Sequence, residues 1–353
     1  MVAISLGSGG AERSTALLSQ LLEKQGFEIS IVILTDKIDY EYAGTLLNLG
    51  VDKKKGNSKW AQLNRLRRFK KFCKEQDIDV IIDNRPRSSA LKELIYLHYL
   101  YKDLKLIYVV RSFQLATYFP NHKRTVRRML NKASRIVGVS KAISEQINDR
   151  FNTDKAVTRY NSIEISSEAS IVEPQKYIIF VGRIAREVKN IDLLLDAYEA
   201  SSCKKEEIQL RIYGNGPDQA WLKDQLEVRN LTNHVHHYPF QKEIEAVIAS
   251  AHFLILTSHY EGFPRVLIEA LAVGTPVISV DCQSGPNEII DHEKNGLLAK
   301  NYDTDALANA MNRFIFDHQL YQSCKSNAQP SVAHLRPEVI GEQWKELIHE
   351  VYN

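Results

Sequence analysis

Residues 253–280 of the chain read FLILTSHYEGFPRVLIEALAVGTPVISV. An apolar run at 253–257 comes first, a short polar loop follows, and a segment with helical spacing leads to a second apolar run at 277–280. Near-continuous apolar strands separated by a helix are typical of parallel sheets that are covered on both faces. The stretch therefore predicts one strand–helix–strand unit of a doubly wound α/β sheet.

The same alternation runs through the chain in two series. The first series predicts strands at 2–6, 29–34, 80–83, 106–110 and 136–139, and helices at about 11–26, 59–76, 87–102, 122–134 and 141–151. The second predicts strands at 177–181, 210–213, 235–238, 253–257 and 277–280, and helices near 190–201, 217–230, 241–250, 264–273, 304–317 and 338–351. Between the series, residues 160–176 are rich in Ser and Glu and lack a helical period, which indicates a linker. We expect two Rossmann-like domains in tandem.

Composition narrows the class of protein. The chain has 353 residues, of which 44% are hydrophobic and 25% charged, as in ordinary globular proteins. Its uncharged apolar runs are short, whereas a membrane-spanning helix needs about 20 such residues, and residues 2–6 predict a strand and not a signal peptide. The four cysteines form no Cys-x-x-Cys pair, so we expect reduced, buried thiols in a cytoplasmic protein.

The charge is distributed unevenly between the two series. Residues 1–160 contain 29 Lys and Arg against 16 Asp and Glu, whereas residues 161–353 contain 17 against 27. This asymmetry indicates two separately folded units, of which the first faces an anionic partner.

Two glutamates frame the start of the helix expected at 264–273. Glu261 lies in the loop before that helix and Glu269 in its second turn, at most ~12 Å apart at ~1.5 Å per residue. The intervening helix N-terminus favours an anion such as phosphate. Two carboxylates that accept hydrogen bonds from hydroxyl groups, one on either side of an anion site, would fit a nucleotide sugar. The alternative is that both glutamates are solvated helix residues.

Basic residues follow the first strand of the second series. Gly182 ends this strand and lets the backbone turn close to a ligand, and Arg183 and Lys189 come next. Arginine suits forked phosphate binding, and lysine supplies a point charge. The alternative is a surface loop held by salt bridges.

A glycine loop, Gly7-Ser-Gly-Gly10, joins the first strand to the first helix. Its amides can hold an anion or a substrate hydroxyl. A dinucleotide fingerprint would need a glycine where this chain has Glu12, so a nicotinamide cofactor is not expected.

Five motifs occur in one order along nearly the whole chain: Gly9-Gly-Ala-Glu-Arg13, Val139-Ser-Lys-Ala-Ile143, Gly182-Arg183 with Lys189, Tyr213-Gly-Asn-Gly-Pro217, and the Glu261/Glu269 pair. Together they resemble the retaining GT-B glycosyltransferases of family 4, which build bacterial glycans. The resemblance implies two Rossmann-like domains facing across a cleft. Residues 1–163 would bind the acceptor, 164–336 the nucleotide sugar, and 337–353 would form a helix that crosses back to the first domain.

The resemblance also implies roles for individual residues. Arg183 and Lys189 would hold the donor diphosphate, Glu261 the donor sugar and Glu269 the ribose. Phe240 would lie by the base, and Gly9 and Gly10 would line the acceptor side. The predicted catalytic residues are Glu261, Arg183, Lys189 and Arg111, and the predicted substrate-binding residues are Gly9, Gly10, Gly182, Gly214, Phe240, Gly262, Phe263, Pro264, Glu269 and Glu288.

The chain departs from the family pattern at two places. Many relatives carry a histidine after the fourth strand of the first domain, where this chain has Arg111; either Arg111 takes over a sugar or phosphate contact or the register is shifted. Ser284-Gly-Pro-Asn-Glu288 replaces a more usual pair of glycines. This form resembles members that use UDP-galactose or its N-acetylamino relative, so the expected donors are UDP-Gal, UDP-GalNAc and UDP-GlcNAc.

We expect no metal and no cofactor. Asp77-Ile-Asp79 precedes a strand and Asp303-Thr-Asp305 resembles a helix cap, so neither is placed as a metal-binding Asp-x-Asp. Arg183, Lys189 and a helix N-terminus could neutralise the leaving diphosphate instead. In enzymes of this family the departing phosphate oxygen takes the proton of the acceptor hydroxyl, and no protein nucleophile is expected here.

The first series also carries two basic segments. Residues 53–74 contain ten Lys and Arg and no acidic residue, and residues 122–135 form a second cluster. We expect Trp60, Leu63, Leu66 or Arg67, and Cys73 to face inward, with the charges outward. This face would contact the anionic inner leaflet of the plasma membrane, where a polyprenyl-diphosphate-linked acceptor is met. A merely solvated helix face is the alternative, and no nucleic-acid-binding motif accompanies the charge.

The predicted function is that of a nucleotide-sugar-dependent hexosyltransferase at the membrane surface, in capsule, lipopolysaccharide or other polysaccharide biosynthesis. The alternatives are a sugar-nucleotide epimerase or phosphorylase of the same fold, and a non-catalytic basic binding module. The last of these is opposed by the presence of four intact residues, namely Glu261, Glu269, Arg183 and Lys189.

Overall fold

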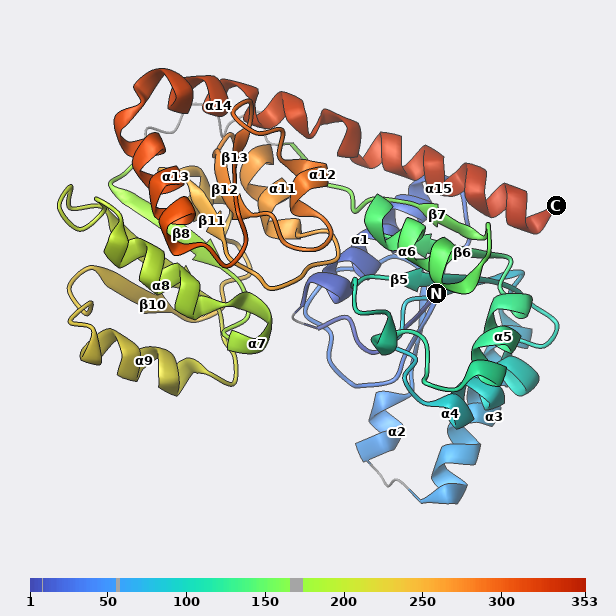
Figure 1. The fold of residues 1–353 in the computed structure, drawn as a ribbon. Coiled ribbons are helices and arrows are strands. Elements are labelled where there is room, and N and C mark those ends of the chain that lie inside the picture. Colours follow the sequence, from blue (N-terminus) through green and yellow to red (C-terminus); the bar gives the residue numbers. More distant parts are fainter. Residues whose placement is uncertain (8, 55–57, 166–173) are drawn as a thin grey trace. The chain divides into compact units, whose positions relative to one another are not determined.

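The computed structural model describes residues 1–7, 9–54, 58–165 and 174–353 (Figure 1). Residues 166–173 of the expected linker and Lys55 of the first basic segment lie outside the described residues. The chain forms two compact units, one of Met1–Ser162 with Pro337–Asn353 and one of Ile163–Arg336. Each unit is described by itself.

The described residues of the first unit form a parallel sheet of seven strands in the order β3-β2-β1-β4-β5-β6-β7. The strands are β1 (Val2–Ala3), β2 (Ser30–Ile33), β3 (Thr45–Asn48), β4 (Val80–Asp83), β5 (Lys105–Val110), β6 (Arg135–Gly138) and β7 (Ala156–Thr158). The helices are α1 (Gly10–Lys24), α2 (Gly50–Lys54), α3 (Lys59–Glu75), α4 (Ala90–Ile95), α5 (Lys123–Lys132), α6 (Lys141–Phe151) and α15 (Pro337–Tyr352), with a π-helical turn η1 (Tyr96–Leu100) and a 3-10 turn η2 (Leu115–Thr117).

The described residues of the second unit form a parallel sheet of six strands in the order β10-β9-β8-β11-β12-β13. The strands are β8 (Tyr177–Val181), β9 (Gln209–Tyr213), β10 (Val235–Tyr238), β11 (Leu254–Leu256), β12 (Val277–Val280) and β13 (Gly296–Ala299). The helices are α7 (Arg186–Lys189), α8 (Ile191–Ala200), α9 (Gln219–Val228), α10 (Glu245–Ala249), α11 (Arg265–Ala272), α12 (Pro286–Ile289), α13 (Thr304–Phe316) and α14 (His318–Ser331), followed by a 3-10 turn η4 (Ala333–Leu335). The prediction of two doubly wound parallel sheets is confirmed.

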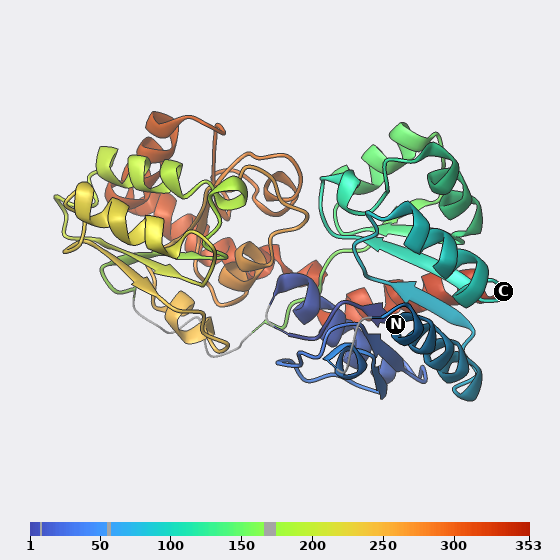
Figure 2. The ribbon, with the colours of Figure 1, turned by 90° about the horizontal axis from the view of Figure 1, so that it is seen from below.

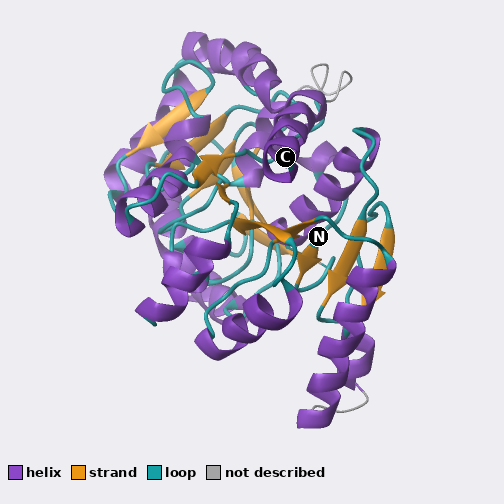
Figure 3. Ribbon diagram, turned by 90° about the vertical axis from the view of Figure 1, so that its right-hand side faces the viewer, coloured by secondary structure: helices purple, strands orange, loops and turns teal. Residues whose placement is uncertain are grey.

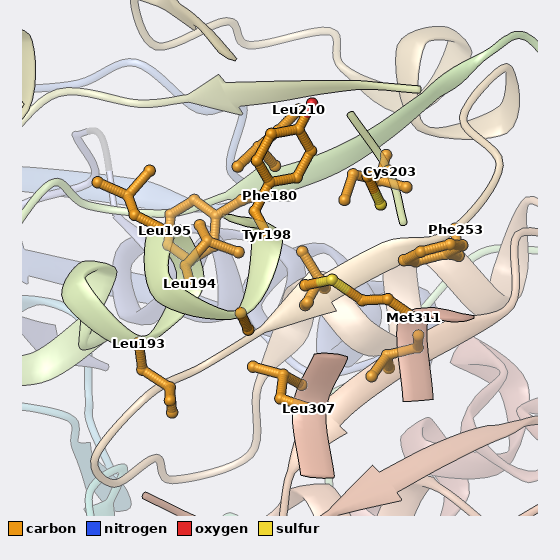
Figure 4. Close-up of a cluster of buried hydrophobic side chains, with 14 of the residues drawn as sticks. Phe180, Leu193, Leu194, Leu195, Tyr198, Cys203, Leu210, Phe253, Leu307 and Met311 are labelled. Atoms are coloured by element: carbon orange, nitrogen blue, oxygen red, sulfur yellow. The ribbon is translucent and has the colours of Figure 1, made fainter. Parts of the chain in front are cut away.

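The core of the second unit shows why these strands are nearly all apolar. Alternate residues such as Phe180 and Leu210 pack against α8 and α13 on one face, in a cluster that includes Leu194 and Met311 (Figure 4). The intervening residues, such as Ile179, are equally buried on the other face. Both faces are therefore covered by helices, which Figure 3 shows as purple coils around orange strands.

The last helix, α15, packs against α1 within the first unit (Figure 2). Gly341 makes the close approach possible, because a Cβ there would lie 2.9 Å from Nε2 of Gln25 and 3.3 Å from the side chain of Leu21. Beside this contact, the rings of Phe27 and His349 are 5.7 Å apart. The end of the chain thus helps to build the first unit.

The inward face expected for the basic helix α3 was partly wrong. Trp60 is 76% exposed and Leu63 is 37% exposed, whereas Phe69 and Cys73 are buried. The buried residues come from the second half of the helix, where the ring of Phe69 lies against that of Tyr96 in η1, whereas Trp60 and Leu63 in the first turns stay exposed among the described residues. Cys73, Cys203, Cys282 and Cys324 are free and buried, as expected. Among helices of the described residues, none has the length and hydropathy of a membrane span.

Candidate functional site

The loops that follow β8, β9, β10, β11 and β12 lie at one edge of the second sheet, because the carboxyl ends of parallel strands meet there. These loops and the helices that follow them carry all the site residues that the sequence predicted for the second unit. The contacts between the loops decide which of these residues meet.

Lys189 and Glu261 form an ion pair across the loops that follow β8 and β11. Nζ of Lys189 lies 2.5 Å from Oε1 of Glu261, and the two side chains are 15% and 14% exposed. The backbone holds Lys189 in place, because the Thr257 hydroxyl donates to its carbonyl oxygen at 2.9 Å. Arg183 is exposed in the loop between β8 and α7, and Lys189 is the last residue of α7.

A second group fixes the Glu261 carboxylate. The Ser258 hydroxyl donates to the same Oε1 at 2.7 Å, and the Glu261 backbone N–H donates to the carbonyl oxygen of Gln283 at 3.2 Å. Glu261 thus connects the loops after β8, β11 and β12. It is not a solvated helix residue.

Gly285 holds the loop after β12 against the turn that precedes α11. Its φ is +99°, and a Cβ there would lie 2.4 Å from Cδ of Pro264, so only glycine fits without a shift. The Ser284 hydroxyl donates to the carbonyl oxygen of Gly262 at 2.7 Å. Pro264 is the residue just before α11 and not within its first turn, one position from the expectation. Phe263 is buried, and Glu288 lies half-buried in α12.

Glu269 lies in the second turn of α11 and is only 7% exposed. Nε of Arg265, one helical turn earlier and 9% exposed, donates to its Oε1 at 3.2 Å. The carboxylate is therefore buried and paired, and the interpretation as a solvated residue is wrong. Ser258 and Arg265 were not predicted as site residues, although Arg265 stands at the i−4 position from Glu269, the spacing of a helical ion pair.

Two further residues connect β9 and β10 to this edge. Gly214 has a φ of +145°, and a Cβ there would lie 1.9 Å from the carbonyl oxygen of Gly182, so the loops after β8 and β9 touch. Phe240 follows β10; its backbone N–H donates to Oδ1 of Asn215 at 3.2 Å, and its side chain is 45% exposed. The structure thus places Phe240 by the motif that contains Gly214.

The edge also shapes the chemistry of its one buried thiol. Cys282 directly follows the turn at the end of β12, and burial, reinforced by the negative charge of Glu261, raises its pKa to about 12. Cys282 is therefore a neutral packing residue at physiological pH, not a nucleophile.

In the first unit, Arg111 comes directly after β5 and is held by two side-chain amides. Its Nη2 donates to Oδ1 of Asn84 at 2.9 Å and its Nη1 to Oδ1 of Asn161 at 3.0 Å. Neither asparagine was predicted, although the position of Asn84 directly after a predicted strand is a signal that could have found it.

Glu12 links the glycine loop to Arg111, because its carboxylate lies beside Gly9 and interacts electrostatically with Arg111. A Cβ at Gly9 would lie 2.3 Å from Oε2 of Glu12, and Gly10 begins α1 with an exposed position. Burial raises the pKa of the Glu12 carboxyl, while its own backbone N–H and the charges of Arg111 and Lys37 oppose the rise. Gly9, Glu12 and Arg111 therefore form a polar group at the carboxyl edge of the first sheet, where β1, β4 and β5 end.

Within the part of the chain that the structure describes, no three His, Cys, Asp or Glu side chains come together as metal ligands would. At the carboxyl edge of the second sheet, Arg183 and Lys189 supply positive charge, and the N-terminus of α11 supplies free backbone N–H groups.

Two family models match the chain. The model described as "Glycosyl transferases group 1" matches residues 161–330, and the model described as "Glycosyltransferase Family 4" matches residues 8–167. Together they cover residues 8–330, which leaves out β1 at the start of the chain and η4 and α15 at its end.

Two of the relatives are named as bacterial glycosyltransferases. The N-acetylgalactosamine-N,N'-diacetylbacillosaminyl-diphospho-undecaprenol 4-alpha-N-acetylgalactosaminyltransferase of Campylobacter jejuni is 28% identical over 92% of each chain. The lipopolysaccharide 1,6-galactosyltransferase of Escherichia coli is 32% identical over 51% of this chain and 52% of its own. Among solved structures, that of HepE from Anabaena in complex with UDP and glucose matches with a TM-score of 0.79 at 19% identity, over 99% of each chain. This last likeness shows the fold.

Proposed function

Since the chain belongs to the GT4-type glycosyltransferases of the GT-B fold, we propose that it transfers a hexosyl or N-acetylhexosaminyl group from a UDP-sugar to a bacterial surface glycan. The anomeric configuration is retained in this reaction. The observation that carries the proposal is the pairing of Lys189 with Glu261 at the edge where the loops after β8, β11 and β12 meet.

The donor is assigned to the second unit by the chemistry of this edge. A lysine ammonium next to a carboxylate offers adjacent partners for an anionic phosphate oxygen and for sugar hydroxyls. Arg183 and Lys189 bind the diphosphate, and Glu261 accepts from hydroxyls of the transferred sugar with the backbone amides of Gly262 and Phe263 beside it. Glu269, held by Arg265, accepts from the ribose hydroxyls, and Phe240 lies against the base.

The reaction needs stabilisation of the charge that develops on the leaving diphosphate. The acceptor hydroxyl attacks the anomeric carbon as the bond to the diphosphate oxygen breaks, and that oxygen takes the hydroxyl proton. Arg183, Lys189 and the N-terminus of α11 stabilise the negative charge, and their positions are set before the reaction starts. Arg111 contributes a contact to the sugar or to its phosphate. No divalent metal is required in this scheme.

Two observations support the choice of donor sugar: the sequence of residues 284–288 and the names of two relatives. Ser284 and Gly285 place this loop against Gly262 and Pro264, next to the residues assigned to the sugar. The Campylobacter and Escherichia relatives are named as an N-acetylgalactosaminyltransferase and a galactosyltransferase. UDP-GalNAc and UDP-Gal are therefore the first donors to test, followed by UDP-GlcNAc.

We also propose that the acceptor is carried on a polyprenyl diphosphate and is met at the inner surface of the plasma membrane. On α5 the exposed residues Lys123, Arg124, Arg127 and Arg128 share one face, opposite the buried Val126 and Met129. Trp60, on the basic helix α3, is largely exposed, and tryptophan is enriched at membrane–water interfaces.

Some of the cations in these segments already pair with carboxylates, so fewer of them are available to bind a membrane surface. Arg68 pairs with Asp52, and Arg135 pairs with Glu350 of α15. The membrane-facing charge is therefore assigned to α5 and to the remaining exposed lysines and arginines of α3, each contributing about 1 kcal/mol near an anionic surface.

The test is a transfer assay with purified protein, the three UDP-sugars and a synthetic polyprenyl-diphosphate-linked sugar, with and without EDTA. A glycosylated product that forms equally well in EDTA supports transfer without a metal. Turnover only after magnesium or manganese is added contradicts the metal-free scheme. Consumption of the UDP-sugar without a glycosylated product favours an epimerase or phosphorylase instead.

A further inference from the structure

The loop after β4 carries a cluster of buried charges that the proposed donor site does not use. Asp83, Arg85, Arg87 and Glu93 are between 0% and 4% exposed. Moving charged groups out of water costs several kcal/mol each unless they are closely paired. The cluster lies at the carboxyl end of a central strand, where ligand-binding residues of parallel sheets gather.

The ion pairs within the cluster fix the ends of the loop. Arg85 binds Asp83 through two hydrogen bonds, from Nε to Oδ1 at 3.0 Å and from Nη2 to Oδ2 at 2.7 Å, and its Nη1 lies 3.4 Å from Glu93. The Tyr101 hydroxyl donates to the same Asp83 carboxylate at 3.2 Å. Burial pushes the pKa of Asp83 upward, but the charges of Arg85 and Arg87 outweigh it and the pKa is lowered, so the carboxylate stays ionised.

Arg87 ties this loop to the end of the neighbouring strand β5. Its Nη1 donates to the carbonyl oxygens of Asp83 at 3.0 Å and of Arg85 at 2.8 Å, and its Nη2 donates to the carbonyl oxygen of Val109 at 3.1 Å. Asp83 and Arg85 flank Asn84 in the chain, and Val109 precedes Arg111 by two residues. One buried guanidinium therefore fixes the backbone around both members of the Asn84–Arg111 contact.

Asn84 is itself held tightly. Its backbone N–H donates to the carbonyl oxygen of Val2 at 2.9 Å, and its side chain is 6% exposed. Oδ1 accepts from Nη2 of Arg111 at 2.9 Å, which leaves Nδ2 buried without a hydrogen-bond partner among the described residues. A buried donor without a partner costs about 1–3 kcal/mol. The orientation of Asn84 therefore gives Arg111 a hydrogen-bond acceptor while the Nδ2 group of Asn84 stays without one in the described part of the chain.

We infer that Asn84 is a positioning residue for Arg111, and that Arg87 and the Asp83–Arg85–Glu93 cluster hold Asn84 in place for this task. The partners at Nη1 and Nη2 are neutral amides, so these two contacts orient the guanidinium without neutralising its charge. The inference rests on the proposed function, because it assigns Arg111 a contact with the sugar or phosphate of the reacting substrate.

The test compares Asn84→Ala, Asn84→Asp and Arg111→Ala with the control Asn148→Ala. Asn148 lies in the same unit and loses two hydrogen bonds to the backbone of Ala156, but it has no bond to Arg111. A displaced catalytic contact of about 1 Å can cost roughly 100-fold in rate. We expect Asn84→Ala to lower kcat by about this factor with the KM for the UDP-sugar nearly unchanged, and Asn148→Ala to leave kcat unchanged.

Two further variants distinguish positioning from a general loss of stability. Asn84→Asp keeps the shape but puts a carboxylate against Arg111, so kcat should fall although the melting temperature does not. The double variant Asn84→Ala/Arg111→Ala should be no slower than Arg111→Ala alone, since both changes remove one function. Arg87→Lys, which cannot hold three carbonyl oxygens as the guanidinium does, should lower kcat in the same manner. A kcat for Asn84→Ala within twofold of the Asn148→Ala value, or losses that multiply in the double variant, would overturn the inference.

A readout without turnover separates this inference from the proposed function. In nitrogen-15 spectra at low temperature, the Nη groups of Arg111, assigned with Arg111→Ala, should be resolved in the unmodified protein and averaged by rotation in Asn84→Ala. Unchanged Nη signals in Asn84→Ala would contradict positioning by Asn84 whatever the assay shows. If the unmodified protein transferred no sugar, the proposed function would fail, and the spectra would still decide whether Asn84 restrains Arg111.

Discussion

The two sheets use charge differently at their carboxyl edges. In the second unit, Lys189 and Glu261 pair directly, and each keeps about a seventh of its side chain exposed. In the first unit, two neutral side-chain amides bind Arg111. The ion pair of that edge, between Asp83 and Arg85, is buried and does not include Arg111. The Lys189–Glu261 pair keeps some contact with solvent, whereas the Asp83–Arg85 pair is almost fully buried. The first edge thus holds its cation through neutral amides, whereas the second holds its cation through a carboxylate that the proposed donor would also bind.

The largest expected effect comes from breaking the pair at the second edge. Lys189→Met should lower kcat by about 100- to 1000-fold, the range for removing one group that stabilises developing charge. Glu261→Gln should lower kcat as well, because it removes the charge of the carboxylate that is assigned to the sugar hydroxyls and that pairs with Lys189. The measurement is product formation from the preferred UDP-sugar. Lys294→Met is the matched control, because Lys294 also pairs with a carboxylate of this unit, Asp291 at 2.7 Å, but its side chain is 71% exposed. Full activity in either site variant would remove the basis of the donor-site assignment.

A smaller effect should separate the two glutamates. Glu269→Gln should weaken UDP binding by roughly 10- to 100-fold, because a hydrogen bond to a charged group contributes about 1.5–3 kcal/mol. Calorimetry with UDP and with inorganic diphosphate measures the difference. Diphosphate affinity should survive in Glu269→Gln and fall in Lys189→Met, since only Lys189 is assigned to the phosphates. If Glu269→Gln lost equal affinity for UDP and for diphosphate, Glu269 would not be the residue that binds the ribose hydroxyls.

The sequence predicted the fold more completely than it predicted the contacts within the site. Alternating apolar runs predicted β8, β10 and β12 with their observed bounds, because buried parallel strands carry a strong pattern. The strands β3, β7 and β13 were missed, since three or four residues at or near a sheet edge carry too few apolar positions to stand out. The helix expected at 87–102 is instead α4 followed by a π-helical turn, a change of hydrogen bonding that side-chain periodicity does not reveal.

At the site, the sequence predicted residues but not their pairing. Motif order predicted Lys189 and Glu261 as neighbours of one ligand, yet 72 positions separate them and only the sheet order brings β8 beside β11. Asn84 and Asn161 carry no motif, and their importance comes only from the bonds to Arg111. Trp60 was predicted to face inward because periodicity cannot show where a helix extends past the residues that cover it.

The glycine between the loops of the second edge offers a test of stability. Gly285→Ala should lower the free energy of unfolding by more than Gly26→Ala, because both have positive φ but a Cβ at Gly26 meets nothing within 4 Å. The shared backbone strain is of order 1–3 kcal/mol, and the excess at Gly285 measures the clash with Pro264. Urea unfolding followed by fluorescence gives both values, each for the transition of its own unit. Equal losses would mean that Pro264 moves aside freely, and UDP affinity in Gly285→Ala should then be normal.

The smallest expected effect concerns the basic face of the first unit. Arg127→Gln removes one exposed cation of α5 and should weaken binding to vesicles containing phosphatidylglycerol about fivefold, the equivalent of about 1 kcal/mol. Arg135→Gln is the control, because the Arg135 guanidinium already pairs with Glu350 and has less charge to offer a lipid surface. Sedimentation with anionic and with neutral vesicles, at low and high salt, measures both variants. The difference between the two arginines should vanish in high salt, since it is electrostatic. If both variants bound anionic vesicles as tightly as the unmodified chain, α5 would be a solvated helix face, and the first unit's positive charge would need a different partner.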